Sequence, residues 1–464
     1  MSAGGAADFP ARWLAHMGGR VPRYTSYPTA NRFTPQLGQA QMRRWLGQLD
    51  PSEPASLYLH VPFCARLCLY CGCNTQAVSA SRPTGDFARA LIAEIGSVAA
   101  ALPQRMRASR VHLGGGTPTT LGADGLAAVM AAIHRRFDII PGAEIAVEID
   151  PRSFDQAMAG ALARLGVTRA SLGVQDFDPE VQAAVGRVQP FAQVAEAVSA
   201  LRGAGIEKLS FDLLYGLPLQ TVETVVRGVG LAAALKPDRV ALFGYAHVPW
   251  MKPQQKALEK FGLPGVEERW RMARAAEARL LSLGYALVGM DHFTLPGDAL
   301  ALAQRVGRLR RNFQGYTEDD APALLGFGPS AISSLPQGYA QSHAETAAWR
   351  GAVERGELAA GRGAALTDDD RLRRAAIERL MCDMRVDLDR LALMFDRAPA
   401  ETFVEERGRL HLLAAEGLVR FDGGLVEMAQ EARPLVRAVA AVFDEYLARD
   451  EDAARAAPRH AVAV

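Results

Sequence analysis

The chain crowds four of its five cysteines into one short stretch: Cys64, Cys68, Cys71 and Cys73. Three thiolates at C-x3-C-x2-C spacing can converge on one point from a single loop, which suits a metal ion or an iron–sulfur cluster better than a set of disulfides. Only one residue separates Cys73 from Cys71, a poor spacing for two ligands of one cluster. We therefore predict Cys64, Cys68 and Cys71 as ligands and leave Cys73 outside the ligand set.

The kind of metal site depends on the fourth ligand. A structural zinc site normally takes a second Cys or His pair farther along the chain, and the sequence has no second cysteine pair. A [4Fe-4S] cluster held by three cysteines leaves one iron open to a small molecule. The spacing therefore favours such a cluster, while zinc with a distant histidine as extra ligand stays the alternative.

The segments around these cysteines predict a parallel sheet. Between residues 56 and about 250, short apolar, β-branched runs alternate with helix-period segments, which is typical of βα units with helices outside the strands. The six strand candidates are 57–61, 110–113, 145–149, 170–174, 209–214 and 239–245. Periodicity alone does not separate an open doubly wound sheet from a partial barrel.

The placement of the polar residues favours the barrel. The cysteine loop follows the first candidate strand and GGGTPT (114–119) follows the second, whereas Glu148, Gln175 and Asp212 lie in or after the next three. Ligands bind at the carboxyl ends of parallel strands in both architectures. Because so many strand ends supply such residues, we predict an α/β fold with a partial (β/α)6 barrel.

Two acids in apolar strands need partners. A carboxylate such as Glu148 or Asp212 costs several kcal/mol in a buried strand unless it is paired or hydrogen-bonded. A ligand with hydroxyl or ammonium groups would satisfy them, and a salt bridge to an arginine such as Arg187 is the structural alternative. Consecutive glycines in 114–116 would let the backbone approach a ligand, although a tight strand-to-helix turn explains them equally well.

The remaining segments suggest two additions to the barrel. Residues 1–55, with RYTSYPT, are predicted as an irregular segment packed on the barrel, and 56–365 as the barrel and its extension, with a helix near 266–283 and a glycine-rich loop, LLGFGPSAISS. Residues 366–464 predict a mainly helical, winged-helix-like domain. It begins with a helix-cap pattern at LTDDD and contains a two-strand ribbon that turns at 422–424.

Composition sets limits on partners and location. A net charge of +1 and the absence of a basic recognition helix argue against nucleic acid. No run of about eighteen apolar residues and no signal-peptide pattern occur, so we predict a cytoplasmic protein without membrane association. A reducing compartment also suits free thiolates. We expect a monomer.

Two motifs together resemble the radical S-adenosylmethionine (SAM) superfamily: C-x3-C-x2-C with Tyr70 before its third cysteine, and GGGTPT on the next strand. Other segments resemble the oxygen-independent coproporphyrinogen III oxidases within it. These are RYTSYPT (23–29), YLHVPFCARLCLYCGCN (58–74), MDHF (290–293), RNFQGYT (311–317) and AISS (331–334).

The resemblance implies cofactors and their residues. It implies a [4Fe-4S] cluster on Cys64, Cys68 and Cys71, SAM at the open iron, and a Cys73 that matters for activity without binding iron. Carried over by motif, the first SAM would contact Tyr58, Gly115, Glu148 and Ile332. A second SAM would contact Tyr70, Gly116, Thr117, Gln175, Arg187, Asp212 and Ala246. Tyr70 is a mild departure, since some members have phenylalanine there.

The resemblance also implies the reaction. A 5'-deoxyadenosyl radical would remove hydrogen from the β-carbon of two propionates of coproporphyrinogen III, giving the vinyl groups of protoporphyrinogen IX in haem biosynthesis. Arg23 and Arg311 are the first candidates to hold propionates, because a guanidinium fork matches a carboxylate. The electron donor and acceptor are left unidentified.

One alternative keeps the fold and changes the function. Related radical-SAM-like proteins bind haem as chaperones and have no decarboxylase activity. Relatives of that kind lack Cys73, RYTSYPT and NFQGYT, so the presence of all three favours the oxidase. A zinc-stabilised barrel with no redox role is the third possibility.

Overall fold

The structure, a computed structural model, describes residues 9–78 and 84–452. The outer ends of the two additions predicted from the sequence, 1–8 and 453–464, lie outside the described residues. Secondary structure, burial and contacts below refer to these described ranges.

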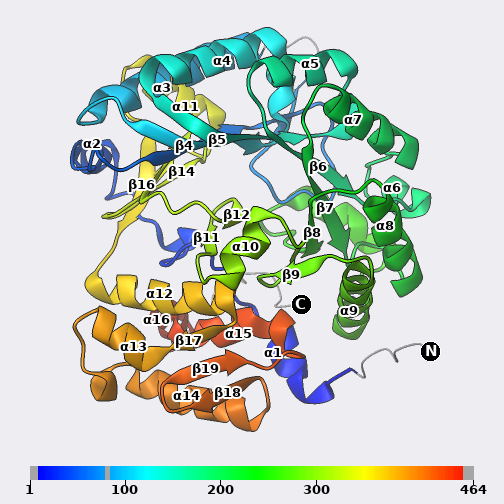
Figure 1. The fold of residues 1–464 in the computed structure, drawn as a ribbon, viewed down its shortest axis with the longest axis vertical. Helices are drawn as coiled ribbons and strands as arrows, with labels where there is room; N and C mark the ends of the chain where they lie inside the picture. The colour runs from blue at the N-terminus through cyan, green and yellow to red at the C-terminus, as the bar shows by residue number, and fades with distance from the viewer. Residues whose placement is uncertain (1–8, 79–83, 453–464) are drawn as a thin grey trace.

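A parallel sheet of six strands forms the centre of the molecule (Figure 1). The strands are hydrogen-bonded in the order β1 (Ala55–Val61), β4 (Arg107–Gly115), β5 (Asp138–Ile149), β6 (Arg169–Gln175), β7 (Lys208–Tyr215) and β8 (Arg239–Gly244). Five of them contain a predicted strand in full, and β8 ends one residue before the predicted 239–245, so the six strands of this sheet were predicted correctly to within one residue. The strand order runs from one edge of the sheet to the other without closing into a ring, as expected of a partial barrel.

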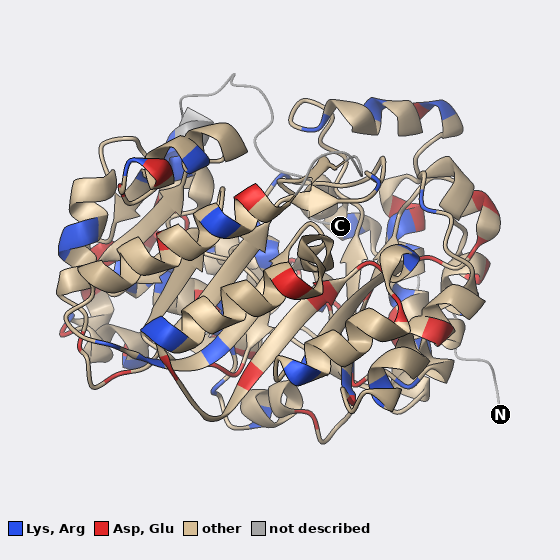
Figure 2. Cartoon of the chain, turned by 90° about the horizontal axis from the view of Figure 1, so that it is seen from above, with Lys and Arg blue, Asp and Glu red and all other residues tan. Residues whose placement is uncertain are grey.

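Helices cover the outer face of this sheet, as the βα alternation predicted (Figure 1). They are α3 (Gly85–Ala101), α4 (Gly122–Arg136), α5 (Gln156–Arg164), α6 (Pro179–Ala184), α7 (Phe191–Gly203) and α8 (Val222–Ala234). Apolar side chains from strands and helices, such as Leu57, Val111 and Ile133, merge into one buried core. Figure 2 shows acidic and basic residues interspersed along these helices.

The sheet continues at both edges beyond the prediction. At one edge β13 (Ala323–Phe327) pairs parallel with β1, followed by antiparallel β14 (Ile332–Leu335), β15 (Gly338–Ser342) and β16 (Ala360–Ala365). At the other edge β10 (His292–Thr294) and β9 (Ala286–Val288) add to β8. Together they make a sheet of 12 strands.

The predicted glycine-rich loop over 324–334 was wrong, since most of it is β13 and β14. A Cβ on Gly326 would lie 2.8 Å from the backbone of Ile332. The glycine therefore permits close packing between two strands instead of marking a loop. Only 328–331 connects the strands, with Gly328 at φ 93°.

Smaller elements surround the sheet. The short strand pairs are β2 (Phe63–Cys64) with β3 (Gln76–Ala77) and β11 (Arg310–Asn312) with β12 (Gly315–Thr317). The helices of the extension are α9 (Val266–Ser282), as predicted, α10 (Ala299–Arg305) and α11 (Thr346–Glu354). No helix among the described residues is long and apolar enough to cross a bilayer.

The C-terminal part is mainly helical and lies at the lower end of the view in Figure 1. Its helices are α12 (Asp368–Asp383), α13 (Leu388–Met394), α14 (Val404–Ala415), α15 (Val436–Ala440) and α16 (Glu445–Asp452). The predicted cap is present, because Thr367 and Asp370 form a reciprocal capping box at the start of α12. The predicted ribbon is β18 (Val419–Asp422) with β19 (Leu425–Met428), and β17 (Arg385–Asp387) adds a third strand that was not predicted.

The N-terminal segment divides between the two parts. Trp13, directly before α1 (Leu14–Gly18), and Met17 within α1 are buried with the C-terminal helices. Trp45 of α2 (Gln39–Gly47) instead belongs to the barrel core. The prediction of an irregular segment packed on the barrel is therefore wrong in two ways. The helix α1 packs on the C-terminal part, and α2 packs on the barrel but is a regular helix. The division of the chain near residues 55 and 365 stays a prediction.

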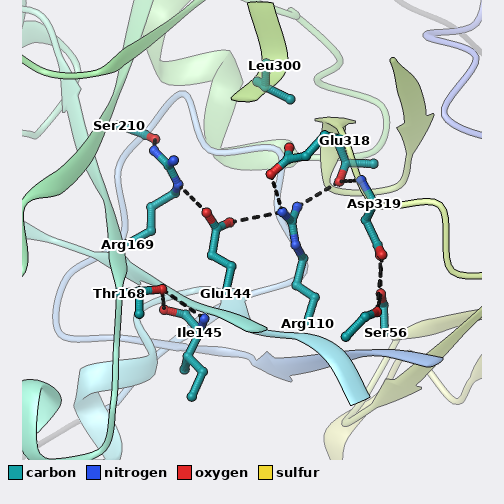
Figure 3. A network of polar contacts seen from close by, with 12 residues as sticks. Ser56, Arg110, Glu144, Ile145, Thr168, Arg169, Ser210, Leu300, Glu318 and Asp319 are labelled. Atoms are coloured by element: carbon teal, nitrogen blue, oxygen red, sulfur yellow. Dashed lines mark hydrogen bonds and ion pairs between the residues drawn. The ribbon is translucent and has the colours of Figure 1, made fainter. Parts of the chain in front are cut away.

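Buried ion pairs lie at the amino ends of the barrel strands (Figure 3). Arg110 of β4 contacts Glu144 (3.4 Å) and Glu318 (2.6 Å), and the Nε of Arg169 lies 2.9 Å from Glu144. Asp298 joins the network through Arg239 (2.9 Å) and Arg169 (3.4 Å). Three guanidiniums thus meet three carboxylates, and the end of the barrel is closed by opposite charges.

Candidate active site

The cysteine loop follows β1 directly and is closed by the pairing of β2 with β3. The thiols of Cys64, Cys68, Cys71 and Cys73 line one cavity of about 150 Å³. All four cysteines are free thiols. The described residues hold no group of three His, Cys, Asp or Glu side chains arranged for a single metal ion. Cys64, Cys68 and Cys71 come from one loop and line this one cavity, and cysteine thiolates are the ligands of iron–sulfur clusters, so the loop fits a cluster.

The same cavity collects polar residues from the ends of successive strands. Its lining includes the predicted residues Tyr70, Gly115, Gly116, Thr117, Glu148, Gln175, Arg187 and Asp212. They come from the cysteine loop, from the end of β4 and the loop after it, from β5, β6 and β7, and from the segment after α6. The structure therefore brings these eight residues together with the four cysteines.

The other five predicted residues lie outside this lining. Tyr58 is on β1, where its hydroxyl lies 3.1 Å from Nδ1 of His60, and Ile332 is buried at the start of β14. Arg23 and Ala246 line a second cavity, and Arg311 lines a third. The roles of these residues stay predictions.

Each thiol of the loop has polar neighbours. Thr117 donates a hydrogen bond to Cys64 Sγ at 3.5 Å, and Thr75 Oγ1 lies 3.2 Å from the same sulfur. A hydrogen bond from the Cys73 thiol lowers the pKa of Cys71 to about 6. Cys71 thus has the character of a thiolate, the form that binds iron, while Cys73 keeps its proton.

The glycines at the end of β4 have a structural explanation. A Cβ on Gly116 would lie 2.5 Å from the carbonyl oxygen of Phe63, and one on Gly115, at φ 107°, would lie 2.6 Å from the His60 ring. The amides of Gly116 and Thr117 donate to the carbonyls of Val61 and Phe63. The glycines therefore let the loop after β4 pack against the start of the cysteine loop, which fixes both loops at the cavity.

The two strand acids, Glu148 and Asp212, differ in their partners. Burial acts to raise the pKa of Glu148, but hydrogen bonds from His112 (3.1 Å) and the amide of Gly115 (2.9 Å) outweigh it and lower the pKa. Burial, followed by the charge of Glu148, raises the pKa of Asp212 to about 7. Among the described residues, the carboxylate of Asp212 has no hydrogen-bond or ion-pair partner. The predicted alternative of a salt bridge to Arg187 is wrong for both acids, since Arg187 pairs with Asp150 at 3.2 Å.

Two arginines reach the sulfur of Cys68. Arg187 Nη1 donates to Cys68 Sγ at 3.3 Å and Arg152 Nη2 at 3.4 Å, and Asp150 pairs with both arginines. The sequence analysis missed Asp150 and Arg152. Their position directly after the third predicted strand was a usable signal, because the other polar residues of the cavity also follow strands.

A segment after β8 holds the backbone of the cysteine loop. Lys252 Nζ donates to the carbonyl of Cys73 (2.7 Å), and Gln254 donates to that of Cys71 (2.9 Å). Gln255 donates to the carbonyls of Tyr70 (2.8 Å) and Ala246 (3.2 Å). These donors, also missed, carry no sequence signal, because lysine and glutamine after a strand are ordinary surface residues.

The two predicted propionate residues lie side by side. Arg311 donates through Nε and Nη2 to the carbonyl of Arg23 (both 3.3 Å), and Arg23 donates to the carbonyl of Gly244 (3.2 Å). Nη1 of Arg311 is buried without a hydrogen-bond partner among the described residues. Arg305, Arg308 and Arg310, from the same basic run, are exposed. Arg311 is therefore the member of that run that could hold a buried ligand.

Comparison with known proteins agrees with this geometry. The model of the radical SAM superfamily matches residues 58–229, and that of the HemN C-terminal domain matches 366–435. An oxygen-independent coproporphyrinogen III oxidase of Bradyrhizobium diazoefficiens is 46% identical over 428 residues, which are 92% of this chain and 95% of the relative. The Escherichia coli protein of the same name is 38% identical and covers 92% and 93%.

A solved structure extends the likeness to the fold. The structure of E. coli coproporphyrinogen III oxidase (HemN), described as a radical SAM enzyme, superposes with a TM-score of 0.87 at 36% identity, over 92% of this chain and 100% of the other. The predicted resemblance, the partial barrel and the helical C-terminal part are thereby confirmed. The chain belongs to the oxygen-independent coproporphyrinogen III oxidase family of the radical SAM superfamily.

Proposed function

We propose that this chain converts two propionate side chains of coproporphyrinogen III to vinyl groups without oxygen, forming protoporphyrinogen IX in haem biosynthesis. One observation carries the proposal beyond family membership. The thiols of Cys64, Cys68 and Cys71 face the same cavity as the polar residues at the ends of β4 to β7. This arrangement supports a cluster and a polar cofactor that would bind in contact with each other.

The cysteine loop would hold a [4Fe-4S] cluster through those three thiolates, with SAM at the open iron. When bound, cluster and SAM together supply the 5'-deoxyadenosyl radical that removes a hydrogen atom from the propionate β-carbon. The substrate radical then loses CO2 and one electron, which leaves the vinyl group. An electron donor and an acceptor outside this chain are required.

The protein's own residues would bind and orient the cofactors. Glu148, held by His112 and the Gly115 amide, is an ionised acceptor for hydroxyl or ammonium groups of SAM. Asp212 would ionise when a cation binds beside it, because an opposite charge favours the carboxylate. Cys73, which donates to Cys71, would keep that ligand in its thiolate form without binding iron.

We also propose two SAM molecules per chain. Gly115 and Glu148 of the first predicted set and Thr117, Gln175 and Asp212 of the second line one continuous cavity. Tyr58 and Ile332 would complete the first site and Ala246 the second. We further propose a cytoplasmic monomer that binds neither membrane nor nucleic acid, since free thiols suit a reducing compartment.

Anaerobic turnover tests the function. The reconstituted protein receives SAM, coproporphyrinogen III, a reductant and cell extract as electron acceptor, and the vinyl product is followed by fluorescence after oxidation. We expect product with the wild type and none with Cys64→Ala. SAM cleavage without porphyrinogen conversion would refute the substrate, and tight haem binding would then indicate the chaperone.

A further inference from the structure

The segment after β8 carries most of the lysines of the chain. Of the five lysines in the sequence, three lie at Lys252, Lys256 and Lys260. Lys256 and Lys260 are exposed on the 3-10 helix η5 (Pro253–Phe261). The acid of this segment, Glu259, lies 3.1 Å from Nε2 of His247. The segment therefore has a net positive charge.

Large apolar side chains are exposed beside these lysines. Met251 is 62% exposed, Trp250 40% and Phe261 37%. The ammonium group of Lys260 lies 4.8 Å from the centroid of the Phe261 ring. Exposed apolar groups rimmed by charges mark interaction sites, and aromatic residues and methionine are enriched in protein–protein interfaces. This surface therefore has the composition of a docking site for another protein.

The helix η5 is packed against the cysteine loop. Leu258 of η5 lies in a small buried core with Val181 and Val185 of α6, and Leu69 of the loop packs on that core. The amide of Leu69 donates to the carbonyl of Val185 at 3.0 Å. Hydrogen bonds from the segment 252–255 to backbone carbonyls of the loop add to this packing. The lysines therefore lie beside the loop that carries the predicted cluster ligands.

The cysteine loop contributes charge of the same sign. Within 64–73 the charged residue is Arg66, which is exposed together with its neighbour Leu67. Arg152 donates to the carbonyl of Arg66 at 3.3 Å and thereby ties this part of the loop to the barrel. A positive and partly apolar surface therefore lies both on the loop and next to it.

The position of this surface indicates the kind of partner. The proposed function requires an electron from a donor outside this chain, and a protein donor must approach the cluster at the cysteine loop. Positive charge at a surface steers an acidic partner towards it and raises the rate of association. Interfaces of electron-transfer proteins are small and weak, so a few charges and apolar side chains suffice.

We propose that this surface docks an acidic one-electron carrier protein, which reduces the cluster. One electron would pass from the reduced carrier to the cluster, so the carrier is oxidised by one electron and the cluster is reduced by one. Lys256, Lys260 and Arg66 would attract carboxylates of the carrier, and Met251 and Leu67 would pack on its apolar surface. The inference rests on the proposed function, since that function requires the electron.

Binding to the reconstituted enzyme tests the inference. The probe is flavodoxin, an acidic protein whose flavin transfers single electrons, and its binding is measured anaerobically by the fluorescence anisotropy of an attached dye. We expect the double variant Lys256→Glu, Lys260→Glu to raise Kd about tenfold or more, and salt to weaken binding to the wild type. The matched control is Lys208→Glu, Lys236→Glu. Both lysines are exposed at the amino ends of β7 and β8, so Kd should stay unchanged.

The choice of reductant separates docking from chemistry. Dithionite is a small molecule that needs no docking surface, so the wild type and both double variants should form 5'-deoxyadenosine from SAM at equal rates with it. With reduced flavodoxin below its Kd, the variant at 256 and 260 should be about tenfold slower, in proportion to its weaker binding. If that variant does not fold, Lys256→Gln, Lys260→Gln decides, and we expect a Kd between those of the wild type and the control on one side and a tenfold increase on the other.

The outcomes distinguish this inference from the proposed function. A wild-type Kd for flavodoxin in the variant at 256 and 260 overturns the docking surface, and so does an equal loss of rate with both reductants. Binding of the wild type to phosphatidylglycerol vesicles, lost in this variant while flavodoxin binding is kept, would assign the surface to a membrane and overturn it as well. The proposed function is refuted separately, by a wild type that cleaves SAM with dithionite but leaves coproporphyrinogen III unconverted.

Discussion

Buried arginines occur at both ends of the barrel, but their surroundings differ. At the amino ends, Arg110, Arg169 and Arg239 face the carboxylates of Glu144, Asp298 and Glu318. Figure 3 shows Arg110 and Arg169 beside Glu144, with Glu318 on the other side of Arg110. At the carboxyl ends, Arg23, Arg269 and Arg437 line a cavity whose carboxylates are engaged with His292 and Arg274. The first cluster is a network of ion pairs at the closed end of the barrel, whereas the second lines a cavity between the barrel, the N-terminal segment and α15.

Two buried acids show the same contrast. Burial acts to raise the pKa of Glu144, but the surrounding guanidiniums outweigh it and lower the pKa to about 2. The pKa of Asp212 rises to about 7, because burial and Glu148 dominate. The amino ends thus serve stability, and the carboxyl ends retain unsatisfied charge that a ligand can satisfy.

Loss of one cluster ligand should abolish chemistry without unfolding the protein. We expect Cys71→Ser to reduce turnover below detection, because two remaining thiolates cannot hold the cluster. Its unfolding midpoint without cluster should stay near that of the wild type, since the loop backbone keeps the bonds from Gln254 and Lys252. Iron analysis, cluster absorption and anaerobic turnover measure this. Cys382→Ser, in the distant α12, is the control and should keep both iron and activity.

Removing an acid at the amino ends of the strands should instead reduce the stability of the fold. Glu144→Ala leaves Arg110 and Arg169 buried with one carboxylate fewer, and breaking a buried pair costs about 3–5 kcal/mol. Urea unfolding measures this loss. Because the pKa of Glu144 is lowered, the wild type should hold this stability above pH 4.5, the ordinary value, and lose it as the pH falls towards about 2. Equal stability of variant and wild type near neutral pH would contradict a neutralised network.

Asp212 should show the reverse dependence on pH. Its folded pKa of about 7 exceeds its ordinary 3.8, so the folded state binds the proton more tightly, and ionisation of Asp212 destabilises the ligand-free protein as pH rises. Asp212→Asn removes this cost. We expect the variant to gain on the order of 4 kcal/mol over the wild type between about pH 4 and about pH 8. Urea unfolding across that range tests it, and a difference that does not depend on pH would show that Asp212 keeps an ordinary pKa.

The sequence predicted the elements whose pattern is local. Each of the six parallel strands is a short apolar run, and the cap at Thr367 is read from residues three apart. The convergence of the cysteine loop, Glu148 and Asp212 followed from one rule of parallel sheets, that the strand ends meet at one edge. These features needed no knowledge of distant contacts.

The features that were missed depend on distant contacts. The pairing of Leu57 with Leu325 makes β13 a strand, and nothing near Leu325 encodes its partner. The meeting of Arg23 with Arg437 requires the C-terminal part to close on the barrel, which no spacing shows. Lys252 and Gln255 donate hydrogen bonds to backbone carbonyls of the cysteine loop. Every residue has such a carbonyl, so the side chains of the loop do not show which residues will donate to it.

The smallest expected effect concerns Arg152, which pairs with a carboxylate of the chain and also contacts a predicted cluster ligand. Asp150 neutralises it, as at the amino ends, and its Nη2 also donates to Cys68 Sγ at the carboxyl ends. N–H donors to cysteine ligands stabilise the extra negative charge of a reduced cluster, so Arg152→Gln should lower the midpoint potential. It should slow reductive SAM cleavage about tenfold, the lower range for residues that support a metal ligand.

Electron paramagnetic resonance during a redox titration measures that potential, and 5'-deoxyadenosine formation measures the cleavage. Arg164→Gln, an exposed arginine on the neighbouring α5, should change neither. If Arg152→Gln keeps the wild-type potential but loses unfolding free energy, Arg152 belongs with the neutralised arginines of the amino ends. A lowered potential with unchanged stability would instead place it with the groups that act on a ligand, because only a donor to Cys68 senses the charge of the cluster.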